Sequence, residues 1–442
     1  MTRGAIIAAL VAFLLPVAAS AASPPGPADP VLYTTRQGDN LYTLAQRYFV
    51  RTADYVRVQR LNRVIDPYRL PVGRTLRIPR ALLRHEPLTA TVIAMRGQVR
   101  VTRGGREVAV AEGTKISEGD EISTAANAFV SLRLEDGSTV SLPSRSRVGV
   151  RRLRRVLLTG GIERSFALEA GRTRAVVTPA ENEDDGFRIS TPVSVSAVRG
   201  TEFRARFEPD SARAATEVID GTVAVAANAE ADPVALAAGF GAVSTAAGTS
   251  PPVPLLPAPE LRRPGKVQDE PELNFEVEPL ENAAAYRVQV ARDAGFLDVA
   301  ADETAQTPNV TLPPVPDGTW FVRASALDAQ GLEGLAATYS FQRRLQQIET
   351  ALEQRQAGRY REYLFRWIVE GSGTRQYRFQ LMKDRPDATP MVDEAGLTTG
   401  RFVVTDLPEG TYYWRVMSVQ FVDGSAFAKW SAMEQLTITP DE

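Results

Sequence analysis

Apolar and polar residues alternate along most of the sequence, and this period of two residues predicts half-buried β-strands. Over residues 87–248 the alternation recurs in short runs, and helical spacing is nearly absent. Val130, Leu132 and Leu134 form one such face, and Asp136–Gly137 has the composition of the hairpin turn that follows. We therefore expect a β-rich roll or sandwich built from short hairpins in this part of the chain.

An internal repeat occupies the last part of the chain. The segment AYRVQVARD at 285–293 matches QYRFQLMKD at 376–384, and PDGTWFVRASAL at 316–327 matches PEGTYYWRVMSV at 408–419. Both pairs keep the same order and nearly the same separation, and every segment alternates apolar and polar residues. The repeat predicts two similar β-sandwich modules in tandem.

A different pattern occurs near the front of the chain. Asp39 or Asn40 can cap a short helix whose apolar residues, from Leu41 to Tyr48, have the spacing i, i+3, i+4 and i+7. A second short helix is expected to end near Asn62, and short strands precede and follow the two helices. The order strand, helix, helix, strand predicts a small βααβ unit.

The 442 residues suggest several cores, so we expect a multidomain, mainly β protein. Residues 342–359, QRRLQQIETALEQRQAGR, favour a helix and predict a short helical connector. The predicted divisions are a signal peptide at 1–21, the βααβ unit at 31–79, a β-rich domain at 86–248, a proline-rich linker at 249–265, and β-sandwich modules at 266–343 and 360–440.

The first residues have the pattern of a cleavable signal peptide. Arg3 gives a positive start, Ala5–Leu15 is an apolar run, and Ala19–Ser20–Ala21 fits a small-residue cleavage site. The alternative is a membrane anchor, but the run is shorter than the roughly 20 residues that a spanning helix needs. We expect an exported, periplasmic protein with no stable membrane insertion after cleavage.

The βααβ unit resembles the LysM family over Leu32–Pro79. The matching residues recur in order with the family's spacing, and they are Tyr33, Gly38–Asp39–Asn40–Leu41, Leu44–Ala45, Leu61–Asn62, Asp66–Pro67, Leu70, Gly73, Leu76 and Ile78–Pro79. LysM modules bind glycans that contain N-acetylglucosamine, chiefly peptidoglycan in bacteria. The resemblance therefore implies peptidoglycan as a partner of this chain.

In that family the glycan lies in a shallow groove between the loop that opens the first helix and the loop before the last strand. The resemblance implies glycan binding by Gly38, Asp39, Asn40, Leu41, Tyr42, Val64, Ile65, Asp66 and Pro67. Backbone amides and Asn40 can hydrogen-bond acetyl carbonyls and sugar hydroxyls, and Leu41 and Ile65 can hold the acetyl methyl group. The alternative is that Asp39 and Asn40 only cap the helix and that Leu41 only packs.

The central region resembles the FecR-type periplasmic domain over roughly residues 86–248. The matching segments are GQVRV from Gly97, Ile116–Leu142, Ser190–Phe207 and Val218–Val225. In signalling members this domain senses an outer-membrane receptor and controls a sigma factor through a cytoplasmic segment. We expect no such segment here, so the resemblance implies the fold and a protein-contact surface rather than sigma-factor control.

The two repeated modules resemble fibronectin type III-like domains, with Trp320 or Trp414 in the core. Arg145–Arg155, RSRVGVRRLRR, contains six arginines and could contact lipopolysaccharide phosphates or an acidic partner. The alternative for this run is a solvated strand face. Residues 181–186, ENEDDG, lack the ligand spacing of a calcium loop and are expected to form an exposed turn.

Composition narrows the chemistry. Lys+Arg 51 against Asp+Glu 53 leaves a net charge of −2, which gives no general attraction to nucleic acid. The chain has no cysteine and a single histidine, His85, so disulfides and multi-histidine metal sites are excluded. We expect no metal, no cofactor and no nucleic-acid partner.

The carboxylates are scattered, and we find neither a serine elbow nor a zinc motif, so we expect no enzyme. The sequence predicts a non-catalytic exported cell-envelope protein. The resemblances imply that its LysM module binds peptidoglycan and that its FecR-like and fibronectin-like domains contact an unknown envelope protein. The alternative is a periplasmic sensor or accessory protein in FecR-type signal transduction.

Overall fold

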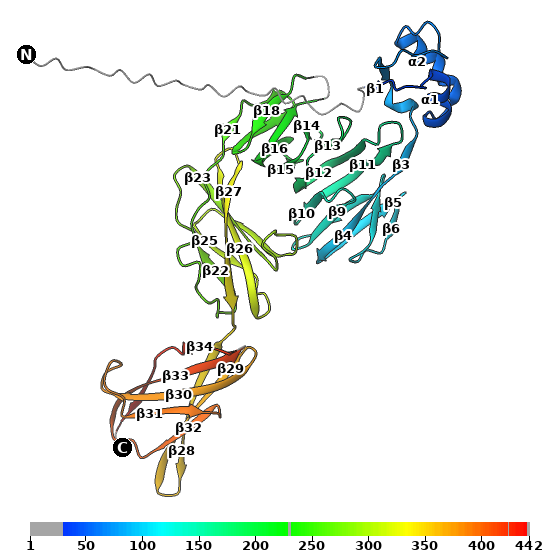
Figure 1. Ribbon diagram of the computed structural model, residues 1–442. Helices are drawn as coiled ribbons and strands as arrows, with labels where there is room; N and C mark the ends of the chain where they lie inside the picture. The colour runs from blue at the N-terminus through cyan, green and yellow to red at the C-terminus, as the bar shows by residue number, and fades with distance from the viewer. Residues whose placement is uncertain (1–29, 229–230, 423, 440–442) are drawn as a thin grey trace, which may run out of the picture.

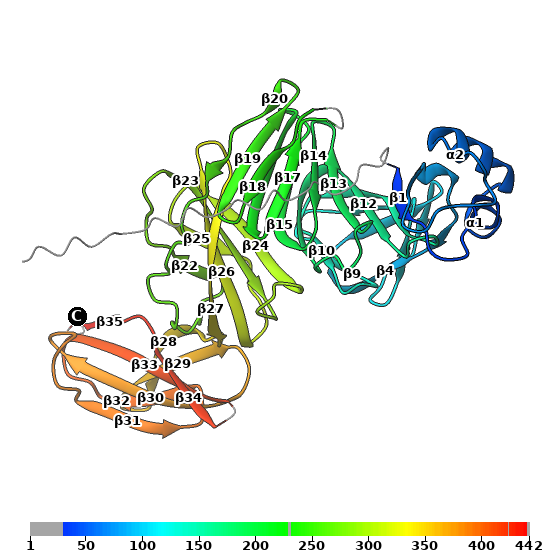
Figure 2. The same ribbon diagram turned by 45° about the horizontal axis from the view of Figure 1, so that its top comes forward.

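The computed structural model describes residues 30–228, 231–422 and 424–439. The predicted signal peptide lies outside these residues. The described chain forms a βααβ unit, a β-barrel, and a first and a second β-sandwich, which follow one another in a bent row (Figure 1, Figure 2). The prediction of a multidomain, mainly β protein is confirmed. Within the described residues, we find no helix whose length and apolar character would let it cross a membrane.

The βααβ unit has the predicted order of elements. Its elements are β1 (Val31–Thr34), α1 (Leu41–Tyr48), a 3-10 turn (Thr52–Asp54), α2 (Tyr55–Leu61) and β2 (Thr75–Ile78). The two strands pair antiparallel. Asn40 caps α1, because its Oδ1 accepts a hydrogen bond of 2.8 Å from the backbone N–H of Thr43. The apolar face of α1 is buried in the core of the unit.

The barrel is made of many short strands. They are β3 (His85–Pro87), β4 (Thr89–Arg96), β5 (Val99–Arg103), β6 (Arg106–Val108), β7 (Lys115–Ser117), β8 (Glu121–Thr124), β9 (Phe129–Leu134), β10 (Thr139–Leu142), β11 (Arg147–Val156), β12 (Ile162–Val177), β13 (Gly186–Thr191), β14 (Ser194–Val198), β15 (Thr201–Glu208), β16 (Arg213–Asp220), β17 (Thr222–Ala226), β18 (Val234–Ala237), β19 (Phe240–Thr245), β20 (Gly248–Thr249) and β21 (Val253–Pro254). Their pairings close on themselves. Val130, Leu132 and Leu134 face the core as expected.

The long strand β12 joins the two halves of the barrel. Its first half pairs with β11 and with β13, and its second half pairs with β15. Gly171 lies where the pairing changes over, with a positive φ of 82°. A side chain at this position would meet the carbonyl oxygen of Arg145 and lie 2.6 Å from the Cα of Ser146. Glycine therefore allows one strand to serve both halves.

The βααβ unit is fixed to the barrel. Arg80, in a 3-10 turn at Arg80–Leu82, is buried and pairs with Glu163 at 3.0 Å and with Asp184 at 3.3 Å. Val156 at the end of β11 packs into the core of the unit. The expectation of an exposed turn at 181–186 is wrong for Asp184 and Asp185, because both are buried. Asp184 pairs with Arg80 at the junction. Asp185 accepts hydrogen bonds from the backbone N–H groups of Ile162 and Asn182 within the barrel.

The two sandwiches share one plan. The first contains β22 (Leu273–Glu276), β23 (Ala283–Ala291), β24 (Val299–Ala305), β25 (Asn309–Leu312), β26 (Gly318–Asp328) and β27 (Glu333–Arg343). The second contains β28 (Gln347–Ala357), β29 (Tyr360–Glu370), β30 (Thr374–Lys383), β31 (Val392–Leu397), β32 (Arg401–Thr405), β33 (Gly410–Val422), β34 (Ser425–Trp430) and β35 (Glu434–Ile438). The repeated segments form the pairs β23–β26 and β30–β33, and Trp320 and Trp414 are buried as expected.

Two connector predictions differ from the structure. The helical connector at 342–359 is wrong, because Gln347–Ala357 forms β28 and pairs with β29 in the second sandwich. The proline-rich segment 249–265 is not a free spacer: β21 pairs with β19 of the barrel, and Leu261 packs into the core of the first sandwich. Both connectors therefore belong to the packed domains.

Candidate functional site

The two loops predicted to bind glycan lie side by side at one end of the βααβ unit. The backbone N–H of Leu41 donates a hydrogen bond of 2.7 Å to the carbonyl oxygen of Pro67. This bond joins the loop that opens α1 to the loop that follows α2. The structure therefore brings the residues 38–42 and 64–67 together.

The acidic residue and the amide of the first loop shape the loop itself. Asp39 accepts hydrogen bonds from the Tyr33 hydroxyl at 2.8 Å and from the backbone N–H of Arg36 at 2.7 Å. Burial, together with the bond to Asp39, raises the pKa of Tyr33 to about 12, so the phenol stays a donor. Asn40 uses its side-chain oxygen as the cap of α1. Gly38 has a positive φ of 89°, which suits glycine.

The apolar residues of the two loops differ in exposure. Leu41 and Val64 are buried in the core, so the expectation that the Leu41 side chain holds an acetyl group is wrong. Ile65 is 98% exposed at the tip of the second loop. Asp66 accepts a hydrogen bond from the backbone N–H of Tyr68 at 2.9 Å and so fixes the turn beside Pro67.

Two segments of the chain match known protein families. The LysM domain model matches residues 33–79, and the FecR protein model matches residues 120–224. This chain contains a LysM domain and a FecR domain. The LysM domain indicates peptidoglycan binding and a place in the cell envelope, and the FecR domain indicates a FecR-type role in signalling. No curated protein matches the chain.

Solved structures with similarity to this chain include a candidate anti-sigma factor from Parabacteroides distasonis, at 21% identity and a TM-score of 0.23. That match covers 28% of this chain and 55% of the other, so the chain spans about half the length of this relative. A segment of two fibronectin type III domains from chicken tenascin matches at 12% identity and a TM-score of 0.21, over 40% of this chain and 97% of the other. Fibronectin(III)-like modules of CbhA from Clostridium thermocellum match at 9% identity and a TM-score of 0.20, over 40% and 90%.

A cluster of tyrosines beside the two loops of the LysM domain was not foreseen from the sequence. The ring of Tyr42, on the first turn of α1, lies 5.7 Å from that of Tyr55 and 5.9 Å from that of Tyr68. Tyr68 is 60% exposed. Aromatic rings offer flat apolar surfaces with a polar edge, which suits the face of a sugar ring. The tyrosine directly after Asp66–Pro67 was the available signal.

The arginine-rich run lies on β11 of the barrel. Four of its arginines pair with glutamates, and these pairs are Arg151–Glu169, Arg152–Glu163, Arg154–Glu163 and Arg155–Glu86. Their charges are used within the domain, which favours the strand-face interpretation over a site for phosphates. In the residues that the structure describes, no group of three or more His, Cys, Asp or Glu has the arrangement of a metal site.

Proposed function

We propose that the chain is a non-catalytic periplasmic protein that holds peptidoglycan through the groove of its LysM domain. The carrying observation is the hydrogen bond between Leu41 and Pro67, which sets the two loops side by side. On this basis Ile65, Tyr42 and Tyr68 offer the apolar surface for the acetyl methyl group and the sugar ring. The barrel and the sandwiches then present surfaces to another envelope protein, and attachment to the wall raises their local concentration there.

Point variants test this proposal better than deletion of the LysM domain. Deletion of residues 31–79 would expose Leu82, Leu83 and Val156, whose side chains pack into the core of the LysM domain. The purified full chain is mixed with insoluble peptidoglycan sacculi and centrifuged, alongside the variants Ile65→Ser and Tyr68→Ala. Both side chains are exposed, so we expect each variant to fold. We expect each variant to stay in the supernatant, whereas the parent chain pellets with the sacculi.

Val50→Ser is the matched control. Val50 is an exposed apolar residue of the same domain, but it follows the C-terminal end of α1, whereas Asn40 marks the other end. We expect this variant to pellet like the parent chain. Equal pelleting of all four proteins would place glycan binding elsewhere, and absence of all four from the pellet would reject wall binding.

A second candidate function is a sensor or accessory role in FecR-type signalling. The match of the FecR family over residues 120–224 favours it. The two functions separate in a deletion strain that is complemented either with the parent chain or with the Ile65→Ser variant. Transcript levels that depend on the chain but not on Ile65 support signalling, and unchanged transcript levels reject it.

A further inference from the structure

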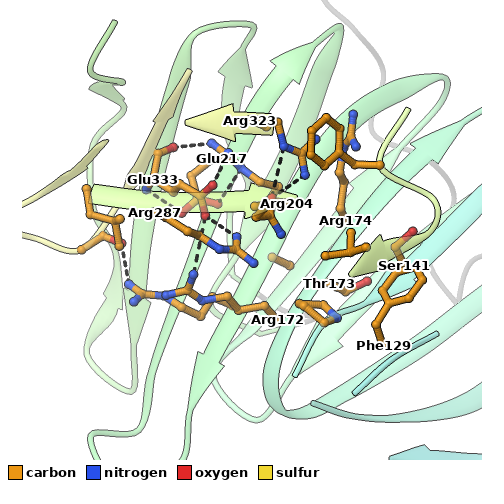
Figure 3. A pocket seen from close by; sticks show the side chains of 18 residues that line it. Phe129, Ser141, Arg172, Thr173, Arg174, Arg204, Glu217, Arg287, Arg323 and Glu333 are labelled. Atoms are coloured by element: carbon orange, nitrogen blue, oxygen red, sulfur yellow. Dashed lines mark hydrogen bonds and ion pairs between the residues drawn. The ribbon is translucent and has the colours of Figure 1, made fainter. Parts of the chain in front are cut away.

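A pocket with a cavity volume of about 40 Å³ lies where the barrel meets the first sandwich (Figure 3). Its walls come from β12, β15 and β16 of the barrel and from β23, β26 and β27 of the sandwich. A cavity of this size has room for a small group such as a carboxylate or a phosphate, and it opens to solvent, so the rest of a ligand can lie outside it. None of the functions proposed above uses this pocket.

Cationic groups outnumber anionic groups in the pocket wall. The charged lining residues are Arg172, Arg174, Arg204, Arg206, Arg287 and Arg323 against Glu217 and Glu333. The carboxylate of Glu333 forms ion pairs with Arg204 at 2.8 Å and with Arg287 at 2.7 Å. Carboxylates outside the wall pair with three of the arginines, and these pairs are Arg174–Glu202, Arg206–Glu208 and Arg287–Asp302. The excess positive charge therefore rests on Arg172 and Arg323.

Arg323 has no carboxylate within ion-pair distance among the described residues. Its Nε and Nη2 donate instead to the neutral Oε1 of Gln289, at 3.1 and 2.6 Å. Its guanidinium lies 4.1 Å from the centre of the Phe296 ring. Burial, together with the positive charge of Arg174, lowers the pKa of Arg323 to about 9. A buried cation without a close carboxylate destabilises the folded protein, and a bound anion would offset this destabilisation.

Arg172 is in a similar position on the barrel side. Its nearest carboxylate oxygen among the described ion pairs is Oε2 of Glu333, at 3.7 Å. Burial, together with repulsion from Arg287, lowers the pKa of Arg172 to about 10. Arg172 and Arg323 come from different domains and line the same pocket (Figure 3).

A polar atom of the same wall lacks a hydrogen-bond partner. Among the described residues the Nε of Arg204 has none, and it lies 3.7 Å from the Oε2 of Glu217. Buried polar groups are nearly always hydrogen-bonded, so this donor has room for an acceptor such as a water molecule or an anionic ligand.

One side of the pocket is apolar. Phe129 of the barrel and Phe296 and Val299 of the sandwich belong to one hydrophobic cluster and also line the pocket. Figure 3 shows Phe129 across the pocket from Glu333. The pocket therefore offers arginines on one side and hydrocarbon on the other.

We propose that this pocket binds a small organic anion, a carboxylate or a phosphate ester with an apolar portion. The anionic group accepts hydrogen bonds from Arg172, Arg204 and Arg323, and the apolar portion lies against Phe129 and Phe296. Because the wall comes from two domains, the ligand also strengthens the contact between them. This proposal does not depend on glycan binding by the LysM domain.

The test is calorimetric titration of the full chain with octanoate, octyl phosphate, inorganic phosphate and octanol, together with melting curves. We expect octanoate or octyl phosphate to bind and to raise the melting temperature, and the tighter of the two to identify the anionic group. Inorganic phosphate lacks the apolar portion and octanol lacks the charge, so both should bind at least about tenfold more weakly.

Two variants and a matched control locate the binding. Arg323→Gln should weaken binding of the octyl anions by about tenfold or more. The repeat supplies the control: Arg415 makes the same two bonds to Gln380 in the second sandwich, outside the pocket, so Arg415→Gln should leave binding unchanged. Arg172→Gln removes a buried guanidinium group whose nearest carboxylate oxygen is 3.7 Å away, so it should weaken binding without lowering the melting temperature of the free protein.

The last variant separates a ligand site from a purely structural junction. Octanol binding as tightly as the octyl anions would overturn the proposal. Absence of binding by either octyl anion, or equal binding by the parent chain, Arg323→Gln and Arg172→Gln, would also overturn it.

Discussion

Arg323 donates two hydrogen bonds to the side-chain oxygen of Gln289, over 3.1 and 2.6 Å. The second sandwich repeats this arrangement, with Arg415 donating to Gln380 over 3.0 and 2.8 Å. In each sandwich the glutamine donates in turn to an aspartate that also binds a second arginine. The barrel covers this network in the first sandwich, whereas it lies nearer to solvent in the second.

The difference in burial predicts unequal effects of one substitution made in both copies. Asp302 binds Arg287, whose side chain is 7% exposed, and Asp393 binds Arg378, whose side chain is 39% exposed. Asp302→Asn leaves the buried Arg287 with only the carboxylate of Glu333, which Arg204 shares, whereas water can reach Arg378. We expect Asp302→Asn to cost about 1–3 kcal/mol of unfolding free energy and Asp393→Asn about 0.2–1 kcal/mol. Denaturation in urea measures both, and equal losses would contradict the prediction.

The core of the LysM domain supplies a second prediction. Leu41 is 0% exposed and Leu32 is 59% exposed. Leu41→Ala should cost about 2–5 kcal/mol, because it removes buried methyl groups and leaves a cavity. Leu32→Ala should change the unfolding free energy by less than about 0.5 kcal/mol. Hydrogen exchange at α1 reports this domain separately, and unchanged exchange in Leu41→Ala would show that the helix does not depend on this contact.

The glycine at the middle of β12 gives a third prediction. Gly171→Ala places a methyl group against the backbone of Ser146 at a positive φ, so we expect a loss of about 3 kcal/mol or more. Gly113 also has a positive φ but open space around it, so Gly113→Ala should cost only about 1–2 kcal/mol. Thermal unfolding of both variants tests this order, and the reverse order would mean that the strand can shift to admit the methyl group.

Asp120 predicts how stability depends on pH. Burial raises its pKa, but hydrogen bonds from Arg103 at 2.8 and 2.7 Å and from the backbone N–H of Ser117 outweigh burial, and the pKa is lowered from 3.8. The folded state therefore binds this proton less tightly than the unfolded state does. The stabilisation is present above about pH 4 and is lost as the pH falls through the folded pKa.

Asp120→Asn should therefore be less stable than the parent chain at pH 7, by about 1–3 kcal/mol. The difference should shrink as the pH falls below about 4. Urea denaturation at a series of pH values measures both proteins. If the difference in unfolding free energy between the two proteins stays constant down to about pH 2, the pH-dependent stabilisation does not come from Asp120.

Local chemistry explains which features the sequence predicted. Asn40 caps α1 through an atom three residues away, and the alternation of Val130, Leu132 and Leu134 needs only the period of a strand. Residues 347–357 contain helix-favouring side chains, yet the chain forms β28, because pairing with β29 and burial against the second sandwich outweigh intrinsic propensity.

The pocket could not be predicted from the sequence. Arg204 and Glu333 are 129 positions apart and belong to different domains, and no periodic pattern links them. Gly171 was missed for a related reason, since its neighbours alternate like those of any strand and only the partner strand reveals the close approach. The exposed state of Ile65 and the burial of Leu41 likewise depend on how the loops fold back on one another.

The buried pairing of Arg80 with Glu163 and Asp184 has a mechanical consequence. The LysM domain is packed against the barrel at this junction, because Val156 of the barrel is part of the core of the LysM domain. If the proposed groove is attached to the wall, a pulling force on the second sandwich passes to the LysM domain through the folded barrel. The spacing between the wall and whatever the sandwiches hold is then set by the length of the folded domains.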